Sequence, residues 1–469
     1  MADDLMKMPP PGLSRWLVGF RTTGALLVLR SAKANELVLR NAQANEPPGQ
    51  ARWGIQQGVD DAPAAAQSPI NDSLLRRWWA IAGLALFGAT WRLWTSQTEF
   101  PQVPLFVWAG SLPSFLDGSV FGILLASLAF AAWKPDSCRI WMTLTVTLSA
   151  LIVLDQHRLQ PWAWQLLLLA FWWGTANVGQ VFNLPVKPRD WQVENLPHVA
   201  LTISIYFWSA VSKLDAEFFV SHGPTLVEAL FGAIGIDATA IPVRMKWWLA
   251  TMLPLGELLV AVGLCWPRTR RAALIGATGL HVGLLLALGP LGLGHRPGVL
   301  LWNVAFLGHD WLLFGRQCKG VRMTMRRSSL VTIRVGVVAL ACLWPLTERW
   351  GWCDRWLAWS VYAARSERVS VTLTAEGQRR LPESARRCLV EGELRLDHWS
   401  LAALDAPIYP QLRFQFGVVE WLRRNCGDDN LVEVLVQHSQ GVGGTIERIT
   451  VEQLSERRRQ FWIGAQPAM

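Results

Sequence analysis

The chain has 469 residues, of which 51% are hydrophobic and only 17% charged. Soluble domains carry about 25% charged residues, so the composition disfavours a purely cytosolic enzyme. Trp occurs 28 times, and because this amphipathic ring concentrates at membrane interfaces, we expect a polytopic membrane protein. The net charge of +9 lies mostly in the apolar middle of the chain, which indicates loops at an anionic bilayer surface and no nucleic-acid partner.

Residues 1–73 begin the chain with a tandem decapeptide, LVLRSAKANE at 27–36 and LVLRNAQANE at 37–46. A stretch rich in Pro, Ala and Gln follows. Bulky apolar side chains are too few here to offset the entropy lost on ordering, so we expect the segment to be disordered. Its short apolar run ends at Arg30, which does not fit an ordinary signal peptide.

Residues 74–347 alternate apolar runs with short polar connections. A bilayer crossing needs about 20 apolar residues, and the runs predict an all-α polytopic membrane helix bundle of about nine spans. The predicted spans are residues 77–95, 118–133, 139–154, 162–182, 198–213, 246–266, 271–290, 298–315 and 329–346.

The connections between these spans differ in charge. Alternate connections carry the basic clusters Arg76/Arg77, Lys134/Arg139, Lys187/Arg189, Arg268/Arg270/Arg271 and Arg316–Arg327, whereas the opposite ones carry fewer basic residues. Because cytoplasmic loops are enriched in Lys and Arg, we expect an inner-membrane protein with a cytoplasmic N-terminus and an extracytoplasmic C-terminus.

Residues 348–469 predict a small extramembrane α+β domain. The segments 369–377 and 431–439 are typical of strands, and 414–424 is typical of an amphipathic helix. Three Cys residues, at 353, 388 and 426, allow either one disulfide with a free thiol or three buried unpaired thiols. The sequence has no CxxC or HExxH motif, so we predict no metal site.

One predicted span carries a polar stripe. His198, Thr202, Tyr206, Ser209 and Lys213 fall within about 80° of arc at about 100° per residue, on an otherwise apolar helix. Either Lys213 extends to the interface while the hydroxyls bond neighbouring helices, or the stripe lines a polar pocket in which a desolvated Lys213 acts as a base.

Two later spans each contain an ionisable residue of the kind that is costly in a bilayer. Glu257 follows Pro254, which interrupts the helical hydrogen bonds, and His281 lies in the middle of its span. Each could be a satisfied packing group, or the two could converge with Lys213. In an earlier connection, Asp155 belongs to the polar turn DQHRLQ, which is either a tight external loop or part of the same polar pocket.

The segment IYFWSAVSKLDAEFF at 205–219 resembles the IYF and KLDADW motif of the vitamin K-dependent gamma-carboxylases, and LDQHRLQPWAW at 154–164 resembles a loop of that family. The forms DQxRxQPW and YFWSGxxKL of bacterial proteins with the horizontally transferred transmembrane domain are more similar still. The resemblance covers about residues 75–346.

The resemblance implies that Lys213 is the base that deprotonates reduced vitamin K or another quinol, with His281 as its functional histidine and Glu257 in place of an intramembrane aspartate. It further implies quinol oxygenation, removal of a γ-hydrogen from a protein or peptide glutamate, and capture of carbon dioxide. Trp162 stands near the position of a family histidine, and the short outer domain matches no substrate region, so quinone chemistry is better supported than carboxylation.

Two other function classes remain open. A non-enzymatic membrane scaffold would use the polar stripe only for helix packing. A redox-partner membrane protein similar to the DoxX group would need exchangeable thiols, yet only Cys265 and Cys342 lie in predicted spans and they are far apart in the sequence.

Overall fold

The computed structural model describes residues 70–176, 191–315, 329–362, 367–438, 445–461 and 463–468. The chain divides into one unit at Met1–Gln67 and a second at Ser68–Met469. The predicted disordered segment 1–73 therefore lies outside the described residues apart from its last four. These four residues begin a helix, and Asp72 accepts a hydrogen bond from Arg76 one turn later at 2.5 Å.

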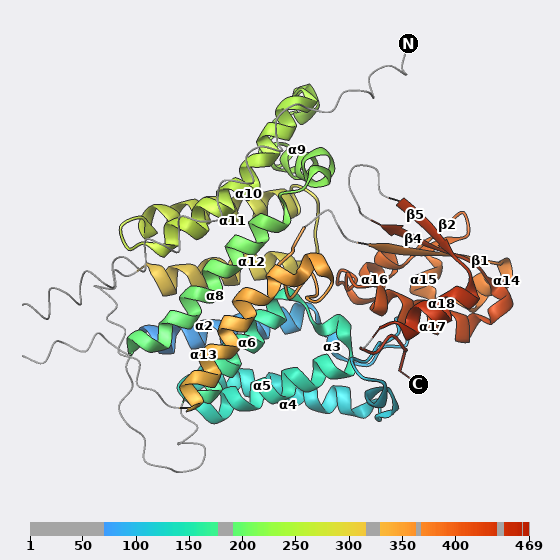
Figure 1. Ribbon diagram of the computed structural model, residues 1–469, viewed down its shortest axis with the longest axis horizontal. Helices are drawn as coiled ribbons and strands as arrows, with labels where there is room; N and C mark the ends of the chain where they lie inside the picture. The colour runs from blue at the N-terminus through green and yellow to red at the C-terminus, as the bar shows by residue number, and fades with distance from the viewer. Residues whose placement is uncertain are drawn as a thin grey trace, which may run out of the picture. The chain divides into compact units, whose positions relative to one another are not determined.

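The second unit begins with a helical bundle (Figure 1). Its helices are α2 (Ile70–Ala89), α3 (Trp91–Trp94), α4 (Phe115–Trp133), α5 (Cys138–Leu154), α6 (Pro161–Thr175), α8 (Trp191–Ser212), α9 (Gly223–Ala233), α10 (Val243–Cys265), α11 (Arg270–Leu288), α12 (Pro297–Phe314) and α13 (Ser329–Leu343). Short 3-10 turns occupy Val107–Ser111, Gln156–Arg158, Ala238–Ala240 and Trp344–Trp350.

Within the described residues, three helices are long and apolar enough to cross a membrane: α4, α10 and α11. Every predicted span overlaps a helix, but the predicted count of about nine crossings is not supported. Helices α5 and α6 have 17 and 15 residues, about 26 and 23 Å long at about 1.5 Å per residue, whereas the bilayer core is about 30 Å thick. Other helices carry more polar residues, such as His309 and Asp310 in α12.

The segment between α8 and α10, where the sequence predicts only a connection, folds into a π-helical turn (Phe218–His222) and α9. Helix α9 packs against α10 and α11. Its apolar face explains why it folds there, because Leu226 and Val227 are buried. The π-helical turn buries Phe218 completely.

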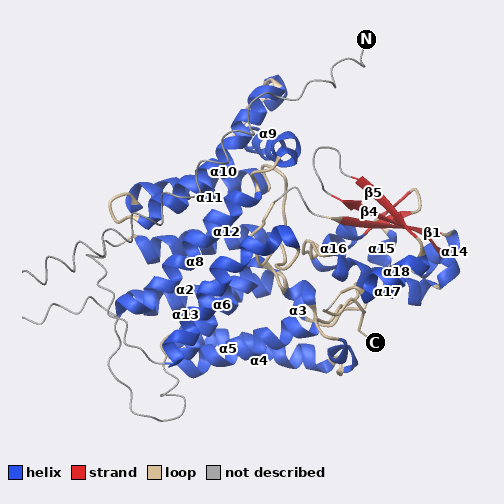
Figure 2. Cartoon of the chain, in the orientation of Figure 1, coloured by secondary structure: helices blue, strands red, loops and turns tan. Residues whose placement is uncertain are grey.

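The C-terminal part contains all five strands of the described residues (Figure 2). They are β1 (Arg368–Leu373), β2 (Leu389–Val390), β3 (Glu393–Arg395), β4 (Leu431–His438) and β5 (Thr445–Ile449), in the antiparallel order β2-β3-β1-β4-β5. The helices are α14 (Ala375–Arg380), α15 (Glu383–Arg386), α16 (Leu396–Leu404), α17 (Leu412–Cys426) and α18 (Val451–Arg459). Strand β4 and helix α17 confirm the predicted strand 431–439 and amphipathic helix 414–424, whereas the predicted strand 369–377 ends at Leu373 and is followed by α14. The three Cys residues at 353, 388 and 426 form no disulfide with one another.

Side chains that alternate along β1 build the core of this part. Val369, Val371 and Leu373 are buried, as are Val434 and Val436 of the neighbouring β4. Helices α16 and α17 both pack against β1. The domain therefore has a single covered sheet face, as expected for an α+β fold.

Polar contacts join the C-terminal domain to the bundle. His157 Nε2 lies 2.9 Å from Pro407 O, and Arg413 Nε donates to Gln156 Oε1 at 2.7 Å. Gln156 Nε2 in turn donates to Gly464 O at 2.5 Å. The DQHRLQ turn is therefore the junction between the two parts.

Candidate functional site

The polar stripe of α8 faces the interior of the bundle. His198, Thr202, Tyr206 and Lys213 are buried, and Ser209 is half-buried. Helix α8 packs against α10 and also contacts α12. Regular helical spacing thus directs these groups toward Glu257 on α10 and Asp310 on α12.

Lys213 and Glu257 form a buried ion pair. Lys213 Nζ lies 3.0 Å from both Glu257 Oε1 and Glu257 Oε2, and only 6% and 9% of the two side chains are exposed. The ammonium also donates to Ser209 Oγ at 2.6 Å and to Ser209 O at 3.1 Å, and Ser209 Oγ donates to Glu257 Oε1 at 3.3 Å. Every ammonium proton has an acceptor, so Lys213 is held inside the bundle rather than extended toward the interface.

A second polar group lies one to two turns deeper on the same face. Tyr206 Oη is 2.8 Å from His281 Nε2 and donates to Asp310 Oδ2 at 2.5 Å. His281 Nδ1 lies 2.9 Å from Asn303 Oδ1. The structure thus links α8, α11 and α12 through four polar side chains.

The donors and acceptors of this group limit where its protons lie. Asn303 Nδ2 donates to Val299 O at 2.9 Å, so Asn303 Oδ1 faces His281 Nδ1 and that nitrogen carries a proton. Tyr206 then either donates to an ionised Asp310 and accepts from a doubly protonated His281, or accepts from a protonated Asp310 and donates to a neutral His281. Moving two protons along this row interconverts the arrangements with no change in net charge. Both ring nitrogens of His281 are occupied, so His281 positions Tyr206.

One polar cavity of about 70 Å³ joins both groups. Five of the six residues predicted for the site line it, namely Lys213, His281, Glu257, Tyr206 and Ser209. The remaining wall includes Asn303, Trp302 and Tyr362. The cavity is larger than one water molecule needs and smaller than the roughly 150 Å³ that admits benzene.

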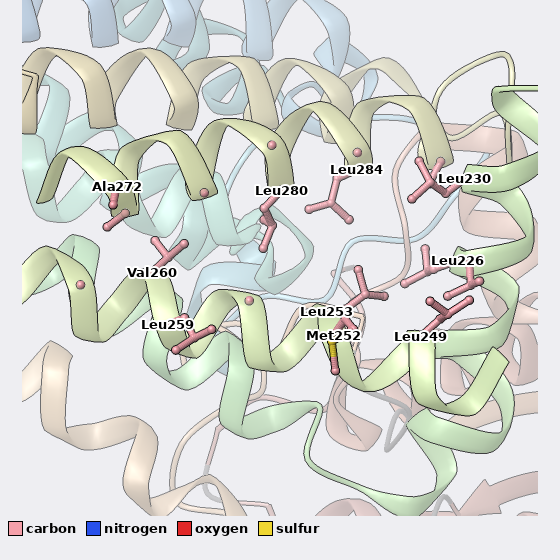
Figure 3. Close-up of a pocket in the computed structure, with 18 of the residues that line it drawn as sticks. Leu226, Leu230, Leu249, Met252, Leu253, Leu259, Val260, Ala272, Leu280 and Leu284 are labelled. Carbon is pink, nitrogen blue, oxygen red and sulfur yellow. The ribbon is translucent and has the colours of Figure 1, made fainter. Parts of the chain in front are cut away.

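An apolar cavity of about 720 Å³ lies between α9, α10 and α11. Leu226, Leu253, Leu280 and Leu284 line both this cavity and the polar cavity. Figure 3 shows leucines from the three helices directed into the gap between α10 and α11. Glycines keep the gap open, since a Cβ added at Gly279 or Gly283 would meet no atom within 4 Å.

The identity of the chain has to be judged from this arrangement. No family model, curated protein or solved structure matches the chain. The resemblance to the vitamin K-dependent carboxylases therefore rests on the sequence motifs alone.

Several members of the polar network were not predicted from the sequence. Asp310 and Asn303 complete the group around Tyr206, and His309 Nε2 lies 2.9 Å from Thr202 Oγ1. Trp79 Nε1 donates to His309 Nδ1 at 2.8 Å. The signal was present, because Asn303, His309 and Asp310 interrupt an otherwise apolar helix, and polar residues in such helices usually have a partner or a function.

Asp155 does not line the polar cavity, although it was predicted to support the pocket. It caps the 3-10 turn that follows α5, where Asp155 Oδ1 accepts from His157 N at 3.1 Å and Val103 N at 3.3 Å. Burial raises the pKa of Asp155 to about 7, against the opposing charge of Arg158, and burial lowers the pKa of His157 to about 4. All six residues of the DQHRLQ turn are buried, so the segment belongs to the junction with the C-terminal domain.

Replacement of Asp155 by Asn is expected to change how stability depends on pH. The folded-state pKa of about 7 exceeds the usual value of about 3.9, so the folded state holds the extra proton between these values. The contribution of this group to stability is therefore complete below about pH 4 and is lost as the pH rises through 7. The amide of the D155N variant would keep an acceptor oxygen without the titration. In detergent, the unfolding midpoint of D155N should rise relative to that of the wild type as the pH increases from 4 to 7.5. A difference between the two midpoints that does not change with pH would contradict the assignment.

Proposed function

We propose that this chain is an integral membrane enzyme related to the vitamin K-dependent gamma-carboxylases and acts on a reduced quinone. The quinone would lie between α10 and α11, with Lys213 as the base. The observation that carries the proposal is the buried Lys213–Glu257 pair beside a large apolar cavity.

Exposed aromatic residues support the membrane part of the proposal. Helix α10 exposes Trp248 near one end and Trp266 directly follows the other, and α4 begins with exposed Phe115 and ends with exposed Trp133. Each pair is separated by about 27 Å at about 1.5 Å per residue, close to the thickness of the bilayer core. Aromatic belts of this kind mark the two interfaces.

The charge asymmetry of the connections supports the topology. We assign the remaining helices of the bundle to the same bilayer, which gives the nine-pass arrangement with a cytoplasmic N-terminus and an extracytoplasmic C-terminus in the inner membrane. The shorter helices would then be accommodated by packing within the bundle and by local thinning of the bilayer.

The residues present fit a quinone with an apolar tail. The apolar cavity has the size of ordinary ligand sites, which occupy about 300 to 1,000 Å³. The ionic and hydroxyl groups that suit a ring oxygen lie behind the leucines that both cavities share. When bound, a reduced quinone supplies an acidic hydroxyl proton. The leucine side chains must turn aside for the ring to reach Lys213, because the polar cavity alone is too small.

Glu257 gives Lys213 a way to become a base. A fully paired ammonium cannot accept a proton, so the amine must first release one to the carboxylate 3.0 Å away. This transfer replaces two buried charges by a neutral amine and a neutral acid, which removes the desolvation penalty of the ion pair. Lys213 is then the proton acceptor, Glu257 stores the first proton, and Ser209 keeps the amine in place.

Filling the apolar cavity is expected to abolish quinone binding without unfolding the protein. Gly283→Leu places a side chain in open space on α11, and exchange of Gly for Leu also favours the helix. Gly118→Leu on α4, where a Cβ also meets nothing within 4 Å, is the matched control. Organic extraction of purified protein should recover quinone from the wild type and G118L but not from G283L.

Equal recovery from G283L, or no quinone in the wild type after incubation with vitamin K hydroquinone, would contradict the proposal. The second outcome would favour a membrane scaffold in which the polar network only packs helices.

A further inference from the structure

A third cavity, of about 310 Å³, lies between the bundle and the C-terminal domain. Its walls come from the start of α12, from Val361, Tyr362 and Glu367 before β1, from α16 and from the loop at residues 405–410. We call this cavity the vestibule. It shares Trp302, Val361 and Tyr362 with the polar cavity, so the vestibule adjoins the cavity that Lys213 lines.

The acidic side chains of the vestibule already have basic partners. Glu367 pairs with His438 at 3.3 Å, and Asp397 pairs with Arg395 at 2.7 Å. Asp405 lies 3.2 Å from Arg296 and 3.4 Å from Arg92. The two aspartates are therefore compensated by arginines, whereas His438, which also lies 2.7 Å from Glu447, compensates Glu367 only when it is protonated.

Arg368, at the start of β1, is the basic residue of the vestibule that lacks such a partner. It lines the cavity and is half-buried, and no acid of the described residues forms an ion pair with it. A guanidinium presents several donors in one plane and binds carboxylate or phosphate groups through two hydrogen bonds. The guanidinium of Arg368 therefore lines the vestibule without a carboxylate partner among the described residues.

Tyr362 supplies a second unpartnered group. Its hydroxyl is buried without a hydrogen-bond partner in the described structure, and the residue adopts a φ of 61°, which is uncommon for a side chain other than Gly. Burial raises its pKa, so the hydroxyl keeps its proton and remains a donor. Buried polar groups without partners and strained backbone both concentrate at functional sites.

We propose that the vestibule binds an anionic oxygen group, a carboxylate or a phosphate, with Arg368 as its counter-ion and the Tyr362 hydroxyl as a second donor. The ligand is either a small water-soluble anion or the headgroup of an anionic lipid. It would lie next to the polar cavity, and the vestibule has no lining residue in common with the apolar cavity. That placement makes the vestibule the entry for a second substrate. This role depends on the function proposed above, whereas the anion site itself does not depend on it.

The test uses the full chain and two kinds of probe. Purified protein in neutral detergent is titrated with acetate and with inorganic phosphate, and binding is followed by calorimetry. The same protein is placed in nanodiscs of phosphatidylcholine with and without phosphatidylglycerol, and its thermal unfolding is compared. Saturable binding of the salts identifies a soluble anion, and stabilisation by phosphatidylglycerol alone identifies a lipid headgroup.

Arg368→Gln is expected to weaken the binding that is observed roughly tenfold or more, since a hydrogen bond to a charged group contributes about 1.5 to 3 kcal/mol. Tyr362→Phe should weaken it by a smaller factor. Arg448→Gln, on exposed β5 with its partner Glu433 outside the vestibule, should leave it unchanged.

Absence of binding by every probe, or equal binding by R368Q and the wild type, would overturn the anion site. The quinone content of the same proteins separates the two proposals. Loss of anion binding in R368Q with normal quinone content supports the anion site independently of the quinone site. Anion binding by a wild-type protein that contains no quinone supports the anion site and contradicts the proposed function.

Discussion

Replacement of Lys213 by Met is expected to lower the free energy of unfolding by about 3 to 5 kcal/mol, because removing one partner leaves a buried charge uncompensated. Glu257, with 9% of its side chain exposed, would have to be protonated or hydrated at a cost. Chemical unfolding of the detergent-solubilised protein, followed by tryptophan fluorescence, would measure the loss.

Two further variants make this prediction specific to the pair. The double variant Lys213→Met/Glu257→Met should regain most of the stability, since apolar groups of similar volume often replace a buried ion pair without loss. Lys246→Met removes a lysine whose partner Glu228 is 48% exposed, and should cost only about 0 to 1 kcal/mol. Similar small losses for K213M and K246M would show that the amine of Lys213 is not confined to the interior.

Replacement of Arg158 by Met is expected to lower the free energy of unfolding by a similar amount, about 3 to 5 kcal/mol. Arg158 lines none of the three cavities. The side chain of Arg158 is fully buried, and its Nη1 lies 2.5 Å from Asp117 Oδ1. It also donates from Nε to Leu93 O at 3.0 Å and from Nη1 to Leu151 O at 3.2 Å. The variant would therefore leave the carboxylate of Asp117 without its counter-ion, although Ser96 Oγ and Gln102 Nε2 still donate to it at 2.8 Å.

Arg92→Met is the matched control for this second variant. Arg92 is 45% exposed and lies 3.4 Å from Asp405, so water can replace its partner and the loss should stay below about 1 kcal/mol. If R158M unfolds at the same denaturant concentration as R92M, the junction is not a principal source of stability.

The sequence predicted the face of α8 well because helical periodicity is a local property. A repeat of polar residues at helical spacing determines which side chains share a face, and the structure finds Tyr206, Ser209 and Lys213 on the wall of one cavity. Glu257 and His281 were recognised because an ionisable group within an apolar run is unusual. Both observations need only the order of residues within one segment.

The partners of these groups depend on packing between distant helices, which one sequence does not determine. Asp310 contacts Tyr206 across 104 positions of the chain, and Thr202 contacts His309 across 107. Asp155 was grouped with the pocket because polarity alone does not distinguish a capping carboxylate from a cavity wall. Helix α9 was missed because its apolar face is short and follows a π-helical turn.

The substitution Lys213→Arg tests the central claim most directly. Arginine keeps a positive charge opposite Glu257, so the protein should fold and retain quinone, but a guanidinium does not give up its proton to become a base. In proteoliposomes supplied with vitamin K hydroquinone and oxygen, the wild type and K246M should form the quinone epoxide. The rate of epoxide formation by K213R should be lower than that of the wild type by a factor of roughly 100 or more, as expected for loss of a general base. Epoxide formation by K213R at a rate within a few-fold of the wild type would contradict the assignment of Lys213 as the base.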